Sequence, residues 1–413
     1  MEAEDCPDAP SLPWRAGSTI VMGVTGLLTR GFLFGASRTE VHGLEGFLKL
    51  LDARKDVQGR ERGLITDDPF VWGVLPLRYC FNPDNLRWSL GSYDICFKNN
   101  GHTLLSTFFS LGQVLPTHRT AHSRHGGLFQ PTITQAIRLL SRGPFPQPTN
   151  PVPAGTTVAV ASPPPLFSHS SGSKASADTT TLAFPRDDPF SGPHLTYITD
   201  MHDAFPTTDP FSGAHLTYTT NTEDCFPAPA AFANRRHAWL HIFPEGKVHQ
   251  KRDKTMRYFK WGVSRLILES EPVPEMVPIW IEGFDTVMHE SRTFPRFVPR
   301  VGKEISVSFG EAVDMERRFG DLRERWRRLV RESDERGGGG REVGVLSEEL
   351  KYGKEVVELR IECTRRVREE VLRVRRSRGL PDEDPKVGLV ETWREEGAKR
   401  EGKMEDGSWV KDT

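Results

Sequence analysis

The chain has 413 residues, of which 37 are glycine and 31 are proline, so we expect one globular core interrupted by long loops and linkers. Lys and Arg (55) almost balance Asp and Glu (56), and this balance argues against a nucleic-acid-binding protein. The five cysteines are scattered without a CxxC pair, which excludes the usual patterns of a zinc site or a disulfide framework.

The N-terminal region, residues 1–40, begins with acidic residues (Glu2, Glu4 and Asp5). A cleavable secretory or mitochondrial presequence is basic there, so we predict none. Residues 18–34 are apolar but contain Arg30, and the segment is shorter than the roughly 20 apolar residues that span a bilayer. It predicts either an interfacial, membrane-associating helix or a helix of the core.

The middle of the chain changes character at about residue 120. Residues 41–119 are predicted to form the first half of a globular domain, because Phe47, Leu48 and Leu51 recur at helical spacing. Residues 120–235 are rich in Ser, Thr, Pro and Gly and contain a duplicated segment that begins at residues 183 and 204. Such a composition cannot bury a core, and two copies are too few for a solenoid. We interpret this range as a disordered, low-complexity surface insertion; the alternative is a partner-docking element.

The second half of the domain is predicted to occupy residues 236–312. An apolar run of strand length, residues 238–243, ends at Pro244. Further along, we predict a helix over residues 256–268 and strands over residues 277–281 and 305–309. Strands interleaved with helices predict an α/β fold, a single domain in which a mixed sheet is flanked by helices.

The C-terminal region, residues 313–378, is predicted to be helical. One helix carries an apolar stripe that includes Phe319 and Trp326, and a second extends over about residues 346–376. The opposite face of the second helix is rich in Arg and Glu, which favours a solvated, salt-bridged surface over a membrane contact. Residues 379–413 are predicted to be a polar, disordered tail.

The most informative motif is Phe243-Pro244-Glu245-Gly246, at the end of a predicted strand. The proline ends the strand, the glycine permits a tight turn close to a ligand, and the carboxylate can accept hydrogen bonds from hydroxyl groups. Six basic residues follow and would favour a phosphate nearby: Lys247, Lys251, Arg252, Lys254, Arg257 and Lys260. The alternative interpretation of these basic residues is a solvated loop.

Further motifs occupy both globular halves of the chain. They are residues 67–76 (DDPFVWGVLP), 94–97 (DICF), 108–116 (FFSLGQVLP) with Arg119, 241–248 (HIFPEGKV), 259–262 (FKWG) and 277–280 (VPIW). In their composition and order these segments resemble the tafazzin family, transacylases within the larger group of glycerolipid acyltransferases, and they look most like its fungal members.

The resemblance implies an activity and its partners. Members exchange acyl chains between phospholipids and lysophospholipids, especially cardiolipin, at a membrane surface, with no acyl-CoA, metal or soluble cofactor and no nucleic acid. It implies a peripheral position on the outer and inner mitochondrial membranes, facing the intermembrane space. It further implies that Asp67 orients a catalytic histidine, that Phe243, Pro244, Glu245 and Gly246 form the glycerol-phosphate contact, and that Arg119 binds phosphate.

The histidine of the implied motif, His-x-x-x-x-Asp, is missing. Arg62 stands five positions before Asp67 and Gly63 five positions before Asp68, and an arginine is always protonated and cannot act as a base. Residues 64–66 resemble the strand that leads into the motif, and three residues cannot form both a strand and the following turn. We infer a short deletion, caused either by a misassigned exon boundary or by a genuine loss.

Three other histidines are candidate substitutes for the base: His42, His118 and His241. None has an aspartate at the required spacing, so we interpret all three as structural. Two alternative functions stay open. One is a lipid-binding paralogue without catalysis, and the other is a glycerolipid acyltransferase that uses acyl-CoA.

Overall fold

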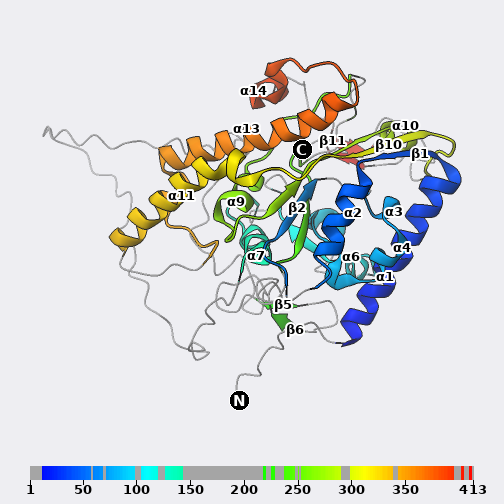
Figure 1. Cartoon of the computed structure of the whole chain (residues 1–413), viewed down its shortest axis with the longest axis horizontal. Helices are drawn as coiled ribbons and strands as arrows, with labels where there is room; N and C mark the ends of the chain where they lie inside the picture. Colours follow the sequence, from blue (N-terminus) through cyan, green and yellow to red (C-terminus); the bar gives the residue numbers. More distant parts are fainter. Residues whose placement is uncertain are drawn as a thin grey trace, which may run out of the picture.

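Two large sheets and the helices around them make up most of the described structure (Figure 1). This computed structural model describes residues 12–56, 59–67, 71–97, 104–119, 126–142, 217–219, 225–227, 237–246, 250, 253–289, 298–337, 343–394, 401–403 and 409–411. It confirms the predicted α/β class, in which helices flank the sheet.

The larger sheet has five strands in the order β4-β3-β7-β2-β8, and each neighbouring pair is parallel. The strands are β2 (Leu64–Asp67), β3 (Trp88–Ser92), β4 (Val114–Thr117), β7 (Trp239–Ile242) and β8 (Glu275–Val277). Because all five run in the same direction, their carboxyl ends lie at one edge of the sheet, where α/β proteins place their ligands.

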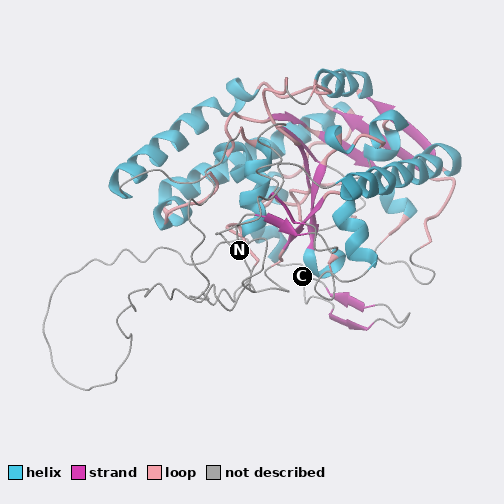
Figure 2. Ribbon diagram, turned by 90° about the horizontal axis from the view of Figure 1, so that it is seen from below, coloured by secondary structure: helices cyan, strands magenta, loops and turns pink. Residues whose placement is uncertain are grey.

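Both faces of this sheet are covered by helices (Figures 1 and 2). Alternate residues enter separate cores, so that Ile65 and Leu240 join one cluster while Leu64 and Trp239 join the other. The first face is covered by α7 (Pro131–Leu140), α9 (Gly262–Glu269), α11 (Met315–Gly337) and α13 (Lys354–Ser377). The second is covered by α1 (Leu12–Gly31), α2 (Leu44–Ala53), α3 (Val71–Val74) and α4 (Leu77–Cys80).

The smaller sheet is mixed and has the order β1-β10-β9. Strand β1 (Arg38–His42) is parallel to β10 (Glu304–Phe309), which is antiparallel to β9 (Ile279–Glu282). The strand predicted over residues 277–281 is therefore two strands in different sheets, divided at Pro278. Proline has no backbone N–H to donate to a neighbouring strand, so it interrupts the hydrogen bonding between strands at this point. The Pro278 carbonyl accepts a 2.8 Å hydrogen bond from the Gly310 amide.

The remaining elements connect this framework. They are η1 (Phe32–Ala36), η2 (Pro83–Asn85), α5 (Tyr93–Cys96), α6 (Leu104–Leu111), α10 (Phe284–Val287), α12 (Glu348–Tyr352), η4 (Pro385–Gly388), α14 (Val390–Arg394) and two hairpins, β5 (Thr217–Thr219) with β6 (Cys225–Pro227) and β11 (Glu401–Lys403) with β12 (Trp409–Lys411). The helix predicted over residues 346–376 is divided into α12 and α13 at Gly353.

The predicted insertion, residues 120–235, started too early. Helix α7 lies inside that range, and its Ile133, Ile137 and Leu140 are buried in the core. Their spacing of i, i+4 and i+7 is that of an apolar helical stripe, and it outweighs the polar composition around it. Residues 143–216, which include the first copy of the duplication, lie outside the described residues.

The predicted disordered tail, residues 379–413, also started too early. The chain forms η4 and α14 after α13, and the Trp393 side chain is buried. Its indole N–H donates a 2.7 Å hydrogen bond to the Val387 carbonyl, and the ring lies 4.1 Å beneath the Arg257 guanidinium. Trp393, together with polar contacts of the same segment, holds this part of the chain against the domain.

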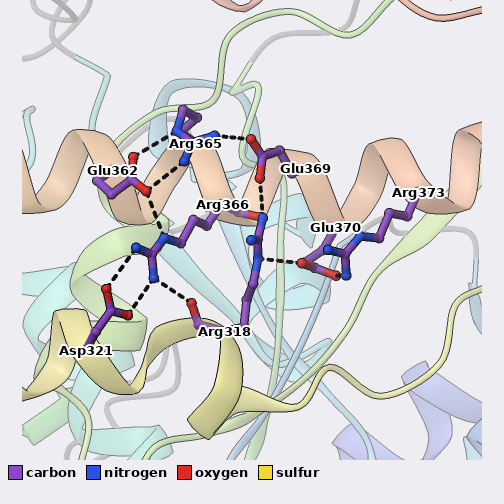
Figure 3. A network of polar contacts seen from close by, with 8 residues as sticks. All are labelled: Arg318, Asp321, Glu362, Arg365, Arg366, Glu369, Glu370 and Arg373. Carbon is purple, nitrogen blue, oxygen red and sulfur yellow. Dashed lines mark hydrogen bonds and ion pairs between the residues drawn. The ribbon is translucent and has the colours of Figure 1, made fainter.

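The salt-bridged face predicted for the second C-terminal helix is confirmed between α11 and α13 (Figure 3). The Arg366 guanidinium contacts both carboxylate oxygens of Asp321, at 2.5 and 2.8 Å. Arg365 similarly forms bonds of 2.7 and 2.8 Å with Glu362. The Arg366–Asp321 pair joins the two helices, whereas the Arg365–Glu362 pair lies within α13. Partly exposed pairs of this kind contribute at most about 1 kcal/mol each.

Helix α1 is longer than the predicted apolar segment and has two different sides. Met22, Gly23 and Gly26 are buried, and the two glycines allow Phe81 and Cys80 to approach the helix backbone closely. The other side exposes large apolar residues: Leu12, Ile20, Val24, Leu27 and Leu28. Among the described residues, only the segment Leu12–Ala36 has the length and apolar character of a membrane span, a test that a core helix also passes.

Candidate functional site

The sequence-predicted site residues come from three strands whose carboxyl ends share one edge. Asp67 is the last residue of β2 and pairs in register with Ile242, the last residue of β7. Phe243 to Gly246 follow β7 directly, and Arg119 follows the end of β4 by two residues. The Asp67 side chain lies outside the described part of the structure, so only its backbone position is fixed by this arrangement.

The turn after β7 presents Glu245 at this edge. Its backbone is closed by a 2.9 Å hydrogen bond from the Gly246 amide to the Phe243 carbonyl, and the Pro244 carbonyl accepts one of 2.7 Å from the Lys260 amide. Gly246 has a φ of 62°, a left-handed conformation that costs any residue with a Cβ atom about 1 kcal/mol or more. The conformation of the turn therefore favours the glycine of the motif at this position.

The Glu245 carboxyl group is partly buried and accepts a 2.8 Å hydrogen bond at Oε2 from the Arg257 amide. Burial raises the pKa of Glu245 to about 7, because desolvation of the charged form outweighs the opposing effects of Arg257 and Arg368. Near neutral pH the group is present in both protonation states. It can therefore either accept a hydrogen bond from a hydroxyl group or donate one to an oxygen atom.

Arg119 is engaged by Asp94, a partner that the sequence did not reveal. Its Nε donates a 3.0 Å hydrogen bond to Asp94 Oδ1, and its Nη2 bonds the second carboxylate oxygen. Asp94 also accepts a 2.6 Å hydrogen bond from the Ser92 hydroxyl group. The pair is partly exposed, so a phosphate at this edge would share the guanidinium with Asp94.

Arg62, five positions before Asp67, lies at the opposite end of β2 from Asp67. Strand β2 runs directly into Asp67 with no turn before it. The residue five positions earlier, Arg62, lies near the amino end of the strand, where its carbonyl accepts a 2.7 Å hydrogen bond from Arg54. Five extended residues span about 16 Å. A side chain at position 62 is thus at the opposite edge of the sheet from the site.

None of the three alternative histidines is placed beside the end of β2 with access to a substrate. His42 ends β1 in the smaller sheet. His118 follows β4 and stacks on Tyr93 at 4.6 Å, but β4 and β2 are separated by two strands, or about 14 Å. His241 lies on β7 but is 0% exposed, and burial lowers its pKa well below the ordinary value.

Comparison with known proteins decides the family. No family model matches the chain. The tafazzin of Saccharomyces cerevisiae is 31% identical over 367 residues, which cover 85% of this chain and 76% of the yeast protein. The chain belongs to the tafazzin family.

Two more distant matches accompany this assignment to the tafazzin family. The tafazzin of Drosophila melanogaster is 23% identical over 320 residues, covering 76% of this chain and 56% of the fly protein. The N-acylphosphatidylethanolamine synthase of Arabidopsis thaliana is 22% identical over 311 residues, covering 72% of this chain and 71% of the plant protein. The tafazzin family identified here is thus one of phospholipid acyltransferases and transacylases.

Proposed function

We propose that the active site of this protein is built to exchange acyl chains between phospholipids and lysophospholipids, with cardiolipin among its substrates. We further propose that the chain with the present sequence lacks the catalytic base. The observation that carries the proposal is the adjacency of Asp67 and the Glu245 turn on the paired strands β2 and β7. Glu245 and Gly246 contact the glycerol-phosphate part of the lipid. Arg119 contributes charge to a phosphate at the same edge.

The proposed reaction is a transfer between two hydroxyl groups. A lysophospholipid hydroxyl attacks the ester carbonyl of a donor phospholipid, and its proton leaves with a general base. The donor departs as a lysophospholipid alkoxide and takes that proton, so the reaction is balanced and reversible. Asp67 would orient a histidine for this role, but this chain has Arg62 at the motif position. The loss of a general base lowers rates by about 10²-fold to 10⁴-fold.

The proposed membrane contact is the exposed side of α1 together with α6. An apolar groove between these helices is lined by Ile20, Val21, Val24, Leu28 and Phe108, among others. Ile20 is 62% and Leu28 69% exposed, and a helix with one buried and one exposed apolar side is suited to the interfacial region of a bilayer. A mitochondrial location is proposed by analogy with the family.

A second candidate, a lipid-binding paralogue without catalysis, is favoured by a different observation. The Glu245 turn is intact, whereas none of His42, His118 and His241 stands beside the end of β2 with access to a substrate. Such a protein would bind lysophospholipid-containing vesicles without exchanging acyl chains. Transcript reads across codons 60–70 separate the two origins, because a longer message encoding a histidine before Asp67 would establish that the deletion is an artefact.

The experiment that tests the proposed reaction offers alternative acyl donors. The chain with a histidine-containing segment restored before Asp67 is incubated with lysophospholipid and either labelled phospholipid vesicles or acyl-CoA. We expect transfer from the phospholipid donor. Transfer from acyl-CoA and none from phospholipid would contradict the proposal and identify an acyl-CoA-dependent enzyme.

A further inference from the structure

The segment that holds Glu245 in place is the loop of residues 253–261, which precedes α9. Its Arg257 amide donates to Glu245 Oε2 at 2.8 Å, and its Lys260 amide donates to the Pro244 carbonyl at 2.7 Å. The loop has no regular secondary structure before residue 262, and Lys254 has a φ of 53°. A non-glycine residue in this conformation must be held by its surroundings.

Two arginines of α13 hold the loop through its carbonyl groups. Arg368 donates from Nε to the Arg257 carbonyl at 3.0 Å and from Nη2 to the Met256 carbonyl at 2.8 Å. Arg375 donates to the carbonyls of Lys254 and Asp253, at 3.1 and 3.3 Å. Four carbonyls of a short loop are therefore bonded by two side chains from a helix more than 100 residues later in the chain.

Glu383, in the segment that follows α13, completes the arrangement. Its Oε1 accepts a 2.5 Å hydrogen bond from the Met256 amide, and its Oε2 forms a 2.5 Å ion pair with Arg368. The side chains of Arg375 and Glu383 are only 1% and 3% exposed, and they lie 3.4 Å apart. Buried charges are costly unless they are paired, and this trio of Arg368, Arg375 and Glu383 is paired within itself and with the loop.

We propose that Arg368, Arg375 and Glu383 are positioning residues for the lipid-headgroup site, because they fix the loop whose Arg257 amide orients Glu245. The inference rests on the proposed function, in which Glu245 contacts the lipid. The segment of residues 379–394 supports the loop at two points. Glu383 bonds to the loop backbone, and Trp393 stacks on the Arg257 guanidinium at 4.1 Å. The C-terminal region thereby belongs to the binding site, although it touches no reacting atom.

The same helix offers a matched control. Arg366 lies two residues from Arg368 and forms a bidentate pair with Asp321, and it belongs to the network that joins α13 to α11 (Figure 3). Within the described residues the Arg366 side chain bonds to Asp321, Glu362 and the Arg318 carbonyl, none of which lies in the loop. Arg366→Gln therefore removes one arginine of α13 without releasing the Glu245 support.

The test compares Arg368→Gln and Glu383→Gln with Arg366→Gln and Glu245→Gln in the full chain. Hydrogen exchange is followed in a peptide that contains the Arg257 amide, and binding is measured to phosphatidylcholine vesicles that contain cardiolipin. We expect Arg368→Gln and Glu383→Gln to raise the exchange of that peptide about tenfold, the effect of losing roughly one net hydrogen bond. They should also weaken vesicle binding as much as Glu245→Gln does, while Arg366→Gln changes neither quantity.

The pH dependence of vesicle binding distinguishes residues that position Glu245 from residues that only stabilise the fold. The charged groups around Glu245 are Arg257, Arg368 and Glu383. Arg368→Gln removes a positive charge and releases the Arg257 amide, so both effects move the pH midpoint of vesicle binding upward. Arg366→Gln leaves the midpoint in place. An unchanged midpoint in Arg368→Gln would overturn the inference.

Failure of the inference and failure of the proposed function give different results. If Glu245→Gln weakens binding but Arg368→Gln frees the Arg257 amide without weakening it, the positioning role is wrong. If Glu245→Gln leaves vesicle binding unchanged, the proposed contact between Glu245 and the lipid headgroup is wrong. If Arg368→Gln leaves the hydrogen exchange of the Arg257 peptide unchanged, the proposed positioning of Glu245 is wrong. If hydrogen exchange in peptides of α7 shows that Arg368→Gln unfolds the protein, Arg368→Lys, which keeps the charge, is tested in its place.

Discussion

The Arg257 amide lies 2.8 Å from Oε2 of Glu245, twelve residues earlier in the chain. The turn that carries Glu245 is thus fixed both by its own Gly246 and by a separate loop. A carboxyl group held in this way is oriented before a ligand arrives, which lowers the entropic cost of binding.

The pH dependence of stability should reveal the burial of Glu245. Its pKa in the folded state, about 7, is above the ordinary value of 4.5 for a glutamate. The folded state therefore binds the proton more tightly, and this contribution is present below pH 4.5 and is lost as the pH rises through 7. As the pH rises from 4.5 to 8, the free energy of unfolding of Glu245→Gln should increase relative to that of the parent chain, by at most about 3 kcal/mol.

Urea unfolding of the two proteins at pH 5 and pH 8 measures this difference. The gain should be larger at pH 8. Equal differences at both pH values would mean that the Glu245 carboxyl group is solvated in the folded protein.

The conformation of Gly246 predicts the effect of a single methyl group. Its φ is 62°, and a Cβ atom there would approach the Lys260 side chain to 2.8 Å. Because that side chain is flexible, the backbone strain dominates, and Gly246→Ala should lower the free energy of unfolding by about 1 kcal/mol. It should also weaken binding to cardiolipin-containing vesicles, since Glu245 would move with the turn.

Gly31→Ala provides the control, because Gly31 is helical and no atom lies within 4 Å of its added Cβ. Chemical unfolding should show no loss of stability in this variant. A Gly246→Ala variant as stable as the parent would contradict the left-handed turn.

The exposed side of α1 predicts a membrane contact that charge would disrupt. Ile20 and Leu28 are exposed, and each apolar side chain buried in a lipid interface contributes about 1.5 kcal/mol or more. Leu28→Asp should therefore weaken vesicle binding by at least about tenfold. Ile361→Asp, at a residue that is 47% exposed on α13, should have no such effect in vesicle sedimentation, and equal losses in both variants would argue against α1 as the contact.

The position of the motif residues at one edge of the sheet was predictable because it depends on strands. Residues 238–243 have the length and apolar character of a strand, and the ends of parallel strands meet at one edge. The sequence thus placed Glu245 directly after a strand, while the site roles of Glu245, Asp67 and Arg119 stay predictions. It did not show that Asp94 holds Arg119, because that contact joins residues 25 positions apart.

The support for Glu245 was not predictable from the local pattern. Arg366 and Arg368 belong to the same Arg-rich helix, and in sequence both resemble solvated residues. Only the tertiary structure shows that Arg366 joins two helices at the surface while Arg368 binds loop carbonyls. Glu383 was assigned to a disordered tail for a similar reason, since its partners lie 15 and 127 residues away.

The rate of acyl exchange before and after restoration of the motif tests the central claim most directly. The purified chain, and the same chain with a histidine-containing segment before Asp67, are given labelled phospholipid and lysophospholipid in vesicles. The account predicts that restoration raises the rate at least about 10²-fold, the usual contribution of a general base. Full-rate exchange by the chain with Arg62 and Gly63 in place would contradict it, because another group would then be removing the proton.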